Sequence, residues 1–222
     1  MAHAMVARFE AEARALANEE RAAGQAAYMK RALPFLGVTR PQLAALRRGW
    51  RREYPLAAPG AYEAVVEGLW ALPFQEGRYQ AVWVCRTWPL DPARLPLYRR
   101  MIEEGAWWDL VDELAAHVVG RLLLEHREAL SPVIRAWGEA PHLWVRRTAI
   151  LAQLQHKEHT DEALLFDLCA ARAHEPDFFI RKAIGWALRQ HARVAPEAVR
   201  AFLEAQGPRL SGLSRREAAK HL

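Results

Sequence analysis

Cysteine is scarce in this chain, and its scarcity limits both the chemistry and the compartment. Only Cys85 and Cys169 occur among 222 residues, far apart and in apolar stretches. This usage argues against a disulfide framework and a cysteine-based zinc site, and it favours the reducing cytoplasm of a bacterium. No apolar run approaches the roughly 18 residues that a membrane-spanning helix needs. The first residues lack a basic segment followed by an apolar one, so we expect no signal peptide and no membrane partner.

The sequence also lacks the common signatures of cofactor and metal chemistry. It has no glycine-rich phosphate loop, no dinucleotide-binding fingerprint, no Gly-x-Ser-x-Gly and no His-Glu-x-x-His. The nearest metal-like cluster is His156, His159 and Asp161, at a predicted helix end. Histidine spacing of this kind is weak evidence for a metal. We therefore expect neither a metal nor a cofactor.

Strand signals are nearly absent, and helical signals run through the whole chain. Sustained alternation and hairpin turns are missing, whereas apolar residues recur at helical spacing, as at Leu110, Leu114, Val118 and Leu122. Prolines fall about where one helix ends or the next begins. The pattern predicts an all-α fold with helices over 4–18, 20–32, 40–53, 60–71, 74–88, 94–104, 107–123, 126–136, 142–156, 161–173, 177–192, 196–206 and 212–220.

Short helices joined by short turns pack antiparallel with their neighbours, in either a closed bundle or a solenoid of helix pairs. The pairs repeat at about forty residues, the period of HEAT-type repeats. Stacked pairs form a curved solenoid with a concave surface that can hold a long ligand. No linker-like tract interrupts the sequence, so we expect one continuous domain over residues 1–222.

The charge balance favours an anionic partner. Lysine and arginine total 31 against 26 acidic residues, which gives a net charge of +5. A basic balance is typical of nucleic-acid-binding proteins, although it does not identify the ligand.

Nine tryptophans are the most informative feature, because several lie beside charged residues. Trp108 and Asp112 are four residues apart and share one face of the predicted helix. The apolar residues of that helix mark another face, while the adjacent Trp107 is expected in the core. An indole and a carboxylate are thus predicted together on the less apolar side. The alternative is a solvated acid beside a half-buried indole.

Two basic segments also contain tryptophan. In Trp144–Arg147, one of the two consecutive arginines can reach outward while the other pairs locally; the alternative is an ordinary surface salt bridge. Lys182, Trp186, Arg189 and Arg193 follow helical spacing and form a stripe of cations around an indole. Such a stripe is typical of a phosphate-binding surface with an aromatic platform, and also of a core tryptophan flanked by solvated cations.

Seven stretches of the chain, in order and at similar intervals, resemble the AlkD-type DNA alkylation repair glycosylases. They are Tyr28–Lys30, Pro34–Val38, Leu69–Pro73, Trp107–Asp112, Leu143–Arg147, Phe178–Trp186 and Leu213–Ala218. The resemblance covers nearly the whole chain. It implies a curved stack of HEAT-like helix pairs that binds duplex DNA. It further implies hydrolytic excision of positively charged N3- and N7-alkylated purines, as the first step of base excision repair. We expect the protein to be a monomer.

The resemblance also implies roles for individual residues. Asp112 matches the essential carboxylate, and Trp108 and Trp186 match tryptophans that contact the sugar and backbone of the damaged nucleotide. Arg147 matches an arginine that supports DNA binding near the lesion, and Tyr28 a further DNA-contacting residue. We also expect the cations Lys157, Lys182 and Arg189 to bind DNA. Gln155 departs from the pattern, since some relatives carry a lysine there, which puts one phosphate contact in doubt.

The chemistry agrees with these roles. An alkylated purine is already cationic, so it leaves as a neutral base without a general acid. One carboxylate can stabilise the remaining oxocarbenium-like sugar and position the attacking water. An indole face can add about 1–2 kcal/mol of cation stabilisation once water is excluded.

Three alternatives stay open at this point. The first is a non-catalytic member that binds bent or branched DNA by shape. The second is a HEAT-like scaffold that binds proteins. The third is a helical hydrolase with a metal at His156 and His159. Fold alone does not decide among them.

Overall fold

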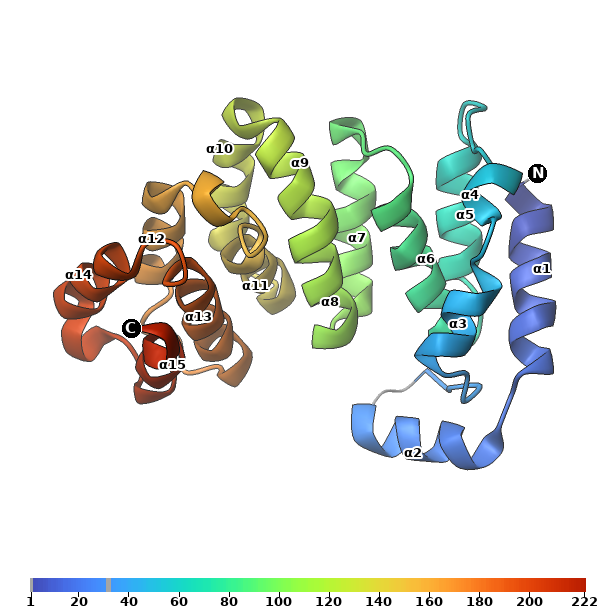
Figure 1. The fold of residues 1–222 in the computed structure, drawn as a ribbon, viewed down its shortest axis with the longest axis horizontal. Coiled ribbons are helices and arrows are strands. Elements are labelled where there is room, and N and C mark those ends of the chain that lie inside the picture. The colour runs from blue at the N-terminus through green and yellow to red at the C-terminus, as the bar shows by residue number, and fades with distance from the viewer. Residues whose placement is uncertain (1, 31–32) are drawn as a thin grey trace. The chain divides into compact units, whose positions relative to one another are not determined.

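A computed structural model describes residues 2–30 and 33–222 of the chain. Every regular element in these residues is helical, and no strand occurs among them (Figure 1). The all-α prediction of HEAT-like helix pairs is confirmed. Neighbouring helices pack against each other, for example α5 (Ala61–Trp70) with α6 (Gln75–Thr87), and α10 (Arg127–Gly138) with α11 (Leu143–Leu151). No helix in the described part is both long and apolar enough to cross a bilayer.

The chain forms two compact units, Met1–Pro89 and Leu90–Leu222. The first contains α1 (Ala2–Ala15), α2 (Glu19–Met29), α3 (Arg40–Leu46), α4 (Trp50–Glu53), α5 (Ala61–Trp70) and α6 (Gln75–Thr87). The second contains α7 (Leu95–Gly105), α8 (Trp108–Leu114), α9 (Gly120–Glu125), α10 (Arg127–Gly138), α11 (Leu143–Leu151), α12 (Glu162–Ala171), α13 (Phe178–His191), α14 (Pro196–Gln206) and α15 (Gly212–Ala218). That both units act as one domain stays a prediction.

The predicted helix boundaries hold within a few residues, except where local chemistry ends a helix early. The helix predicted over 40–53 is two helices, because Gly49 adopts a left-handed conformation with φ of 81° between α3 and α4. The helix predicted over 142–156 is α-helical only to Leu151. The helix predicted over 20–32 ends as α2 at Met29, and residues 31–32 lie outside the described residues.

In the first unit, a buried carboxylate organises the loop between α2 and α3. Glu76 accepts hydrogen bonds from the backbone N–H groups of Leu36, Gly37 and Val38 at 3.0–3.1 Å. Gly37 has φ of 83°, and a Cβ there would lie 2.2 Å from the carbonyl oxygen of Asn18. The resembling stretch Pro34–Val38 is thus a tightly held loop, because its amides find an ionic acceptor instead of a helix partner.

In the second unit, α8 and α9 form one continuous helix joined by a π-helical segment, Ala115–Val119. A π-helical turn adds a residue to the usual spacing and rotates the residues that follow it. Gly120 then lies against the end of α11, where its carbonyl accepts a hydrogen bond from His156 Nε2 at 2.8 Å. The helix that carries Asp112 is therefore held against the end of α11 at Gly120, directly after the π-helical segment.

Gly120→Ala is expected to destabilise the second unit. An added Cβ would lie 2.2 Å from the carbonyl oxygen of Ala152, a backbone atom that cannot move without shifting α11. Overpacking of this kind costs about 1–3 kcal/mol, which urea denaturation would measure. Gly212→Ala is the control in the same unit, because its added Cβ would meet only the flexible end of Arg216, at 3.3 Å. Equal free energies of unfolding for the two variants would contradict the close packing of Gly120 against Ala152.

Candidate nucleic-acid site

The second unit places Asp112 of α8 directly against Arg147 of α11. Arg147 Nε donates to Asp112 Oδ1 at 2.7 Å, and a terminal nitrogen donates to Oδ2 at 2.8 Å. These parallel bonds form a bidentate pair, the strongest arrangement between arginine and a carboxylate. The Asp112 side chain keeps 15% of its surface exposed, whereas that of Arg147 keeps 5%. The carboxylate is therefore the part of the pair that solvent or a ligand can reach.

Arg147 also fixes the orientation of this pair relative to α13. Its other terminal nitrogen donates to the carbonyl oxygen of Phe179 at 2.5 Å. Phe179 lies in the first turn of α13, where the capping residue Asp177 accepts a hydrogen bond from its N–H at 2.7 Å. A single buried guanidinium thus connects α8, α11 and α13. Its geometry leaves the Asp112 carboxylate little freedom to rotate.

The surroundings change the acidity of Asp112. Burial raises the pKa of its carboxyl above the ordinary value, because the charged form loses hydration. The hydrogen bonds and positive charge of Arg147 act in the opposite direction, and the neighbouring Asp109 and Glu113 add to the rise. The result is a carboxylate in a setting of reduced polarity, where its attraction for a developing positive charge is stronger than in water.

Aromatic side chains surround the guanidinium. Phe179 lies with its ring centroid 4.8 Å from that of Trp144 and 5.3 Å from that of Trp107. The Arg147 guanidinium lies 5.9 Å from the Phe179 ring and 6.0 Å from the Trp144 ring. Trp107, expected in the core, is instead half-buried in this cluster. The cluster shields Arg147 from water and so supports the pair that it makes.

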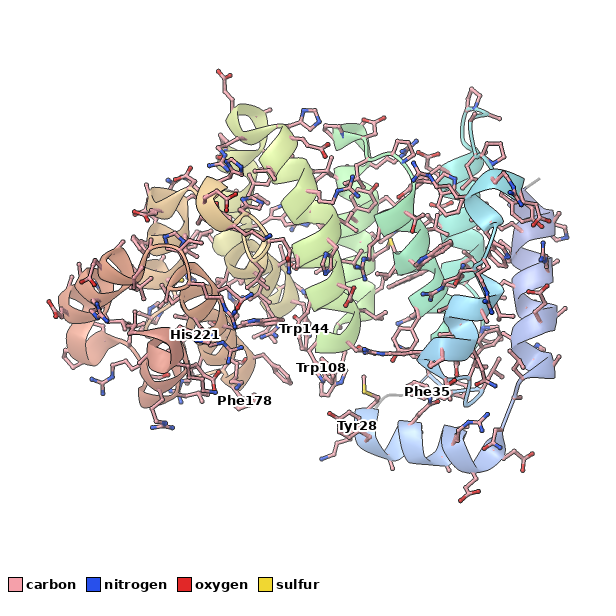
Figure 2. The ribbon with its side chains drawn as sticks, viewed as in Figure 1. Tyr28, Phe35, Trp108, Trp144, Phe178 and His221 are labelled. Carbon is pink, nitrogen blue, oxygen red and sulfur yellow. The ribbon has the colours of Figure 1, made fainter. Side chains whose placement is uncertain are left out.

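Trp108 begins α8, one turn before Asp112, and it is half-buried. Figure 2 shows it at the lower end of α8, and it shows Phe178 at the lower end of α13. The Phe178 side chain is 57% exposed, and its ring packs edge-on against Phe179 at 5.5 Å. Trp108 and Asp112 therefore share one end of one helix face, as their spacing predicts. Phe178 and Phe179 were not singled out as site residues from the sequence, because an adjacent phenylalanine pair also fits a core.

The predicted basic stripe, Lys182, Trp186, Arg189 and Arg193, is present, but two of its cations pair with a carboxylate. Lys182 Nζ lies 3.2 Å from Glu217 Oε1, and Arg189 donates to Glu217 Oε2 at 3.0 Å. Trp186 lies between them along α13 and is half-buried. Arg193, the last cation of the stripe, is exposed. The stripe is thus real, but Lys182 and Arg189 are not solvated cations without partners.

The remaining predicted DNA contacts lie elsewhere. Lys157 is exposed and, with Arg193, lines a shallow cleft of about 250 Å³ beside α13. Gln155, the departure from the family pattern, is also exposed and lines the same cleft. Tyr28 lies in the first unit, near the end of α2, with 74% of its surface exposed.

Both consecutive arginines of α11 are paired, contrary to the expectation that one reaches outward. Arg146 Nε lies 2.9 Å from Glu175 Oε1, and this arginine also donates to the carbonyl oxygens of Ala140 and Pro141 at 2.8 Å. The physical reason is that the segment before α13 supplies Glu175 to Arg146, while α8 supplies Asp112 to Arg147. The sequence could not predict this, since Glu175 and Phe179 lie about thirty residues away.

The histidines do not form a metal centre in the part of the chain that the structure describes. No group of three or more potential metal-ligating side chains converges there. His156 is buried, and its Nε2 donates to the carbonyl oxygen of Gly120. Burial lowers the pKa of His156, so its neutral form is favoured. This hydrogen bond joins the segment after α11 to Gly120, at the start of α9.

Comparison with known proteins places the chain in a family. Residues 9–222 match the family described as DNA alkylation repair enzyme. The chain belongs to this family. A solved structure described as a predicted DNA alkylation repair enzyme from Enterococcus faecalis is similar, with a TM-score of 0.85 and 28% sequence identity over 93% of this chain and 96% of that chain. A search of curated proteins finds no match.

Family membership confirms the coarser part of the resemblance: a DNA alkylation repair enzyme, with DNA as the indicated partner. The match spans both compact units. The glycosylase chemistry and the residue roles go beyond that statement.

Proposed function

We propose that this family member is a DNA glycosylase that hydrolyses the N-glycosidic bond of N3- and N7-alkylated purines in duplex DNA. The observation that carries the proposal is the Asp112 carboxylate, held in a bidentate pair by buried Arg147 yet partly exposed, one turn after Trp108. A carboxylate of this kind is fixed, negatively charged and accessible from one side. Those are the properties needed to stabilise a sugar cation.

The reaction needs little else from the protein. The bond between C1′ of the sugar and the purine nitrogen breaks, and its electron pair neutralises the positively charged base. Asp112 stabilises the oxocarbenium-like sugar through charge attraction and accepts a hydrogen bond from the incoming water. The water adds to C1′ and gives its proton to the carboxylate. The products are a neutral alkylated base and an abasic sugar. Atoms and charge balance with water alone, so the reaction requires no metal or cofactor.

The tryptophans and cations have separate roles in this proposal. The faces of Trp108 and Trp186 contact the sugar and backbone of the damaged nucleotide, where their quadrupoles favour positive charge. Lys157, Lys182 and Arg189 contact DNA phosphates, and Tyr28 contributes a contact from the first unit. Arg147 supports the site by holding Asp112. The protein acts as a monomer in the bacterial cytoplasm, associated with the nucleoid through DNA.

The direct test is to incubate the protein with methylated duplex DNA and identify the released bases by chromatography. Release of 3-methyladenine or 7-methylguanine above a no-protein control is the expected result. DNA binding without base release would contradict the proposal and favour a non-catalytic member that binds DNA by shape. No DNA binding at moderate salt would favour a protein-interaction scaffold, and loss of activity with a chelator would favour a metal hydrolase.

The pH dependence offers an independent check on Asp112. The ionised carboxylate is the active form, so the rate of base release falls as the pH is lowered through its pKa. Because burial raises that pKa above its ordinary value of 3.8, the loss begins at a higher pH than for a solvated aspartate. Single-turnover rates corrected for acid-catalysed release would measure it, with circular dichroism to confirm folding. A rate that holds constant to pH 3.8 in folded protein would contradict this assignment.

A further inference from the structure

A buried carboxylate on α15 holds the cations of the α13 stripe. Glu217 Oε1 accepts a hydrogen bond from Lys220 Nζ at 2.7 Å and lies 3.2 Å from Lys182 Nζ. Its other oxygen accepts from Arg189 at 3.0 Å. The Glu217 side chain is 11% exposed, and the ammonium groups of Lys220 and Lys182 hold its pKa below the ordinary value. The carboxylate is therefore ionised and aimed at the stripe.

Close helix packing explains how one carboxylate reaches both cations. Gly185 lies between Lys182 and Arg189 on α13, and a Cβ there would be 2.5 Å from the Cβ of Glu217. Ser214 Oγ donates to the carbonyl oxygen of Arg181 at 2.9 Å and ties the same two helices together. Lys182 and Arg189 are two helical turns apart, so they emerge on the same face. The glycine allows α15 to place Glu217 between them.

We propose that Glu217 lowers the affinity of the protein for DNA by competing with DNA phosphates for Lys182 and Arg189. The inference rests on the DNA-binding part of the proposed function. A carboxylate and a phosphate accept the same charge-assisted hydrogen bonds. Each phosphate that contacts Lys182 or Arg189 must first displace the Glu217 carboxylate, so this internal competitor lowers the affinity for DNA.

The test compares two charge-matched variants on undamaged duplex. Glu217→Gln removes the competitor, whereas Glu204→Gln removes an exposed acid of α14 that forms no ion pair among the described residues. Fluorescence anisotropy over a range of salt concentrations measures affinity and its salt dependence. For Glu217→Gln we expect several-fold tighter binding at low salt. Glu217 holds Lys182, Arg189 and Lys220, so its removal makes up to three cations available. The slope of log affinity against log salt should steepen by up to about 2.7, because each new phosphate contact contributes about 0.9. Glu204→Gln should change the slope little.

A second comparison isolates the cations. Arg193→Gln removes the exposed member of the stripe and should reduce the slope by about 0.9 whether residue 217 is Glu or Gln. Arg189→Gln should reduce the slope by less than this in the parent protein and by the full amount in the Glu217→Gln background. Equal effects of Arg189→Gln in both backgrounds would overturn the proposal.

The outcomes separate this inference from the glycosylase proposal. A Glu217→Gln variant that melts like the parent protein and shows an unchanged slope overturns the inference, even where the parent releases alkylated bases. Should that variant fail to fold, Glu217→Asp replaces it: the shorter side chain keeps its charge but cannot reach both cations. For Glu217→Asp, a slope of log affinity against log salt that is steeper than that of the parent, by less than expected for Glu217→Gln, supports the inference. An unchanged slope overturns it. A parent protein that binds duplex without releasing bases contradicts only the proposed chemistry.

Discussion

Asp112→Asn is expected to release no measurable 7-methylguanine from methylated duplex DNA. The substitution keeps the shape of the side chain but removes the negative charge that faces the sugar. Stabilisation of a developing charge by one preorganised group is worth a factor of about 10² to 10³ in rate. Asp112 would also lose its role as proton acceptor, which contributes a further factor of about 10² to 10⁴. The measurement is single-turnover base release under saturating protein.

The same variant has a structural cost that must be separated from its chemistry. Asparagine can still accept one hydrogen bond from Arg147, but its amide group then faces the second guanidinium donor. Leaving a buried donor unsatisfied costs about 1–3 kcal/mol, which thermal unfolding would report. Affinity for undamaged duplex should change little. Base release at the parent rate by folded Asp112→Asn would rule out Asp112 as the catalytic residue.

Trp186→Phe is a milder substitution in the proposed site, and its rate of base release can be compared with that of Asp112→Asn. It removes the indole but keeps an aromatic side chain at this position of α13. A retained rate there, beside the lost rate of Asp112→Asn, would assign the larger effect to the carboxylate. The two residues belong to different helices, α13 and α8, so their effects can be measured separately.

The helices, and the residues that share a helix face, could be predicted from the sequence because they depend on residues close together in the chain. Proline positions and apolar spacing indicate most helices, and the four-residue spacing of Trp108 and Asp112 places them on one face. The break at Gly49 and the π-helical segment after Leu114 could not be predicted in the same way. The apolar pattern continues through both, and glycine permits the left-handed conformation of Gly49 without requiring it.

The partners of the charged site residues were the least predictable feature. Arg147 pairs with a carboxylate 35 positions earlier, and Arg189 with one 28 positions later. Helical spacing shows which residues share a face, but not which face of another helix lies opposite. The helical spacing predicts a stripe of cations for phosphate binding. The structure pairs Lys182 and Arg189 of this stripe with a carboxylate and leaves Arg193 exposed. The electrostatics of the site are therefore a tertiary property.

Arg147→Ala is expected to abolish efficient base release through its effect on Asp112. Its guanidinium donors already bind Asp112 and the carbonyl oxygen of Phe179, and its side chain is buried. Removing one member of a buried ion pair costs about 3–5 kcal/mol, because the other charge is left without a partner. The carboxylate would then be favoured in its protonated form and free to rotate. A small displacement of a catalytic group can lower the rate by about 10²-fold.

The contacts of Arg147 favour this positioning role over direct phosphate binding, and the salt dependence distinguishes the two. If Arg147 acts through Asp112, the slope of log affinity against log salt stays at the parent value, whereas a lost phosphate contact lowers it by about 0.9. Arg147→Lys keeps the charge but cannot form the bidentate pair, so its rate should lie between those of the parent and Arg147→Ala. Full activity with a lowered salt slope in folded Arg147→Ala would show instead that the arginine contacts DNA directly.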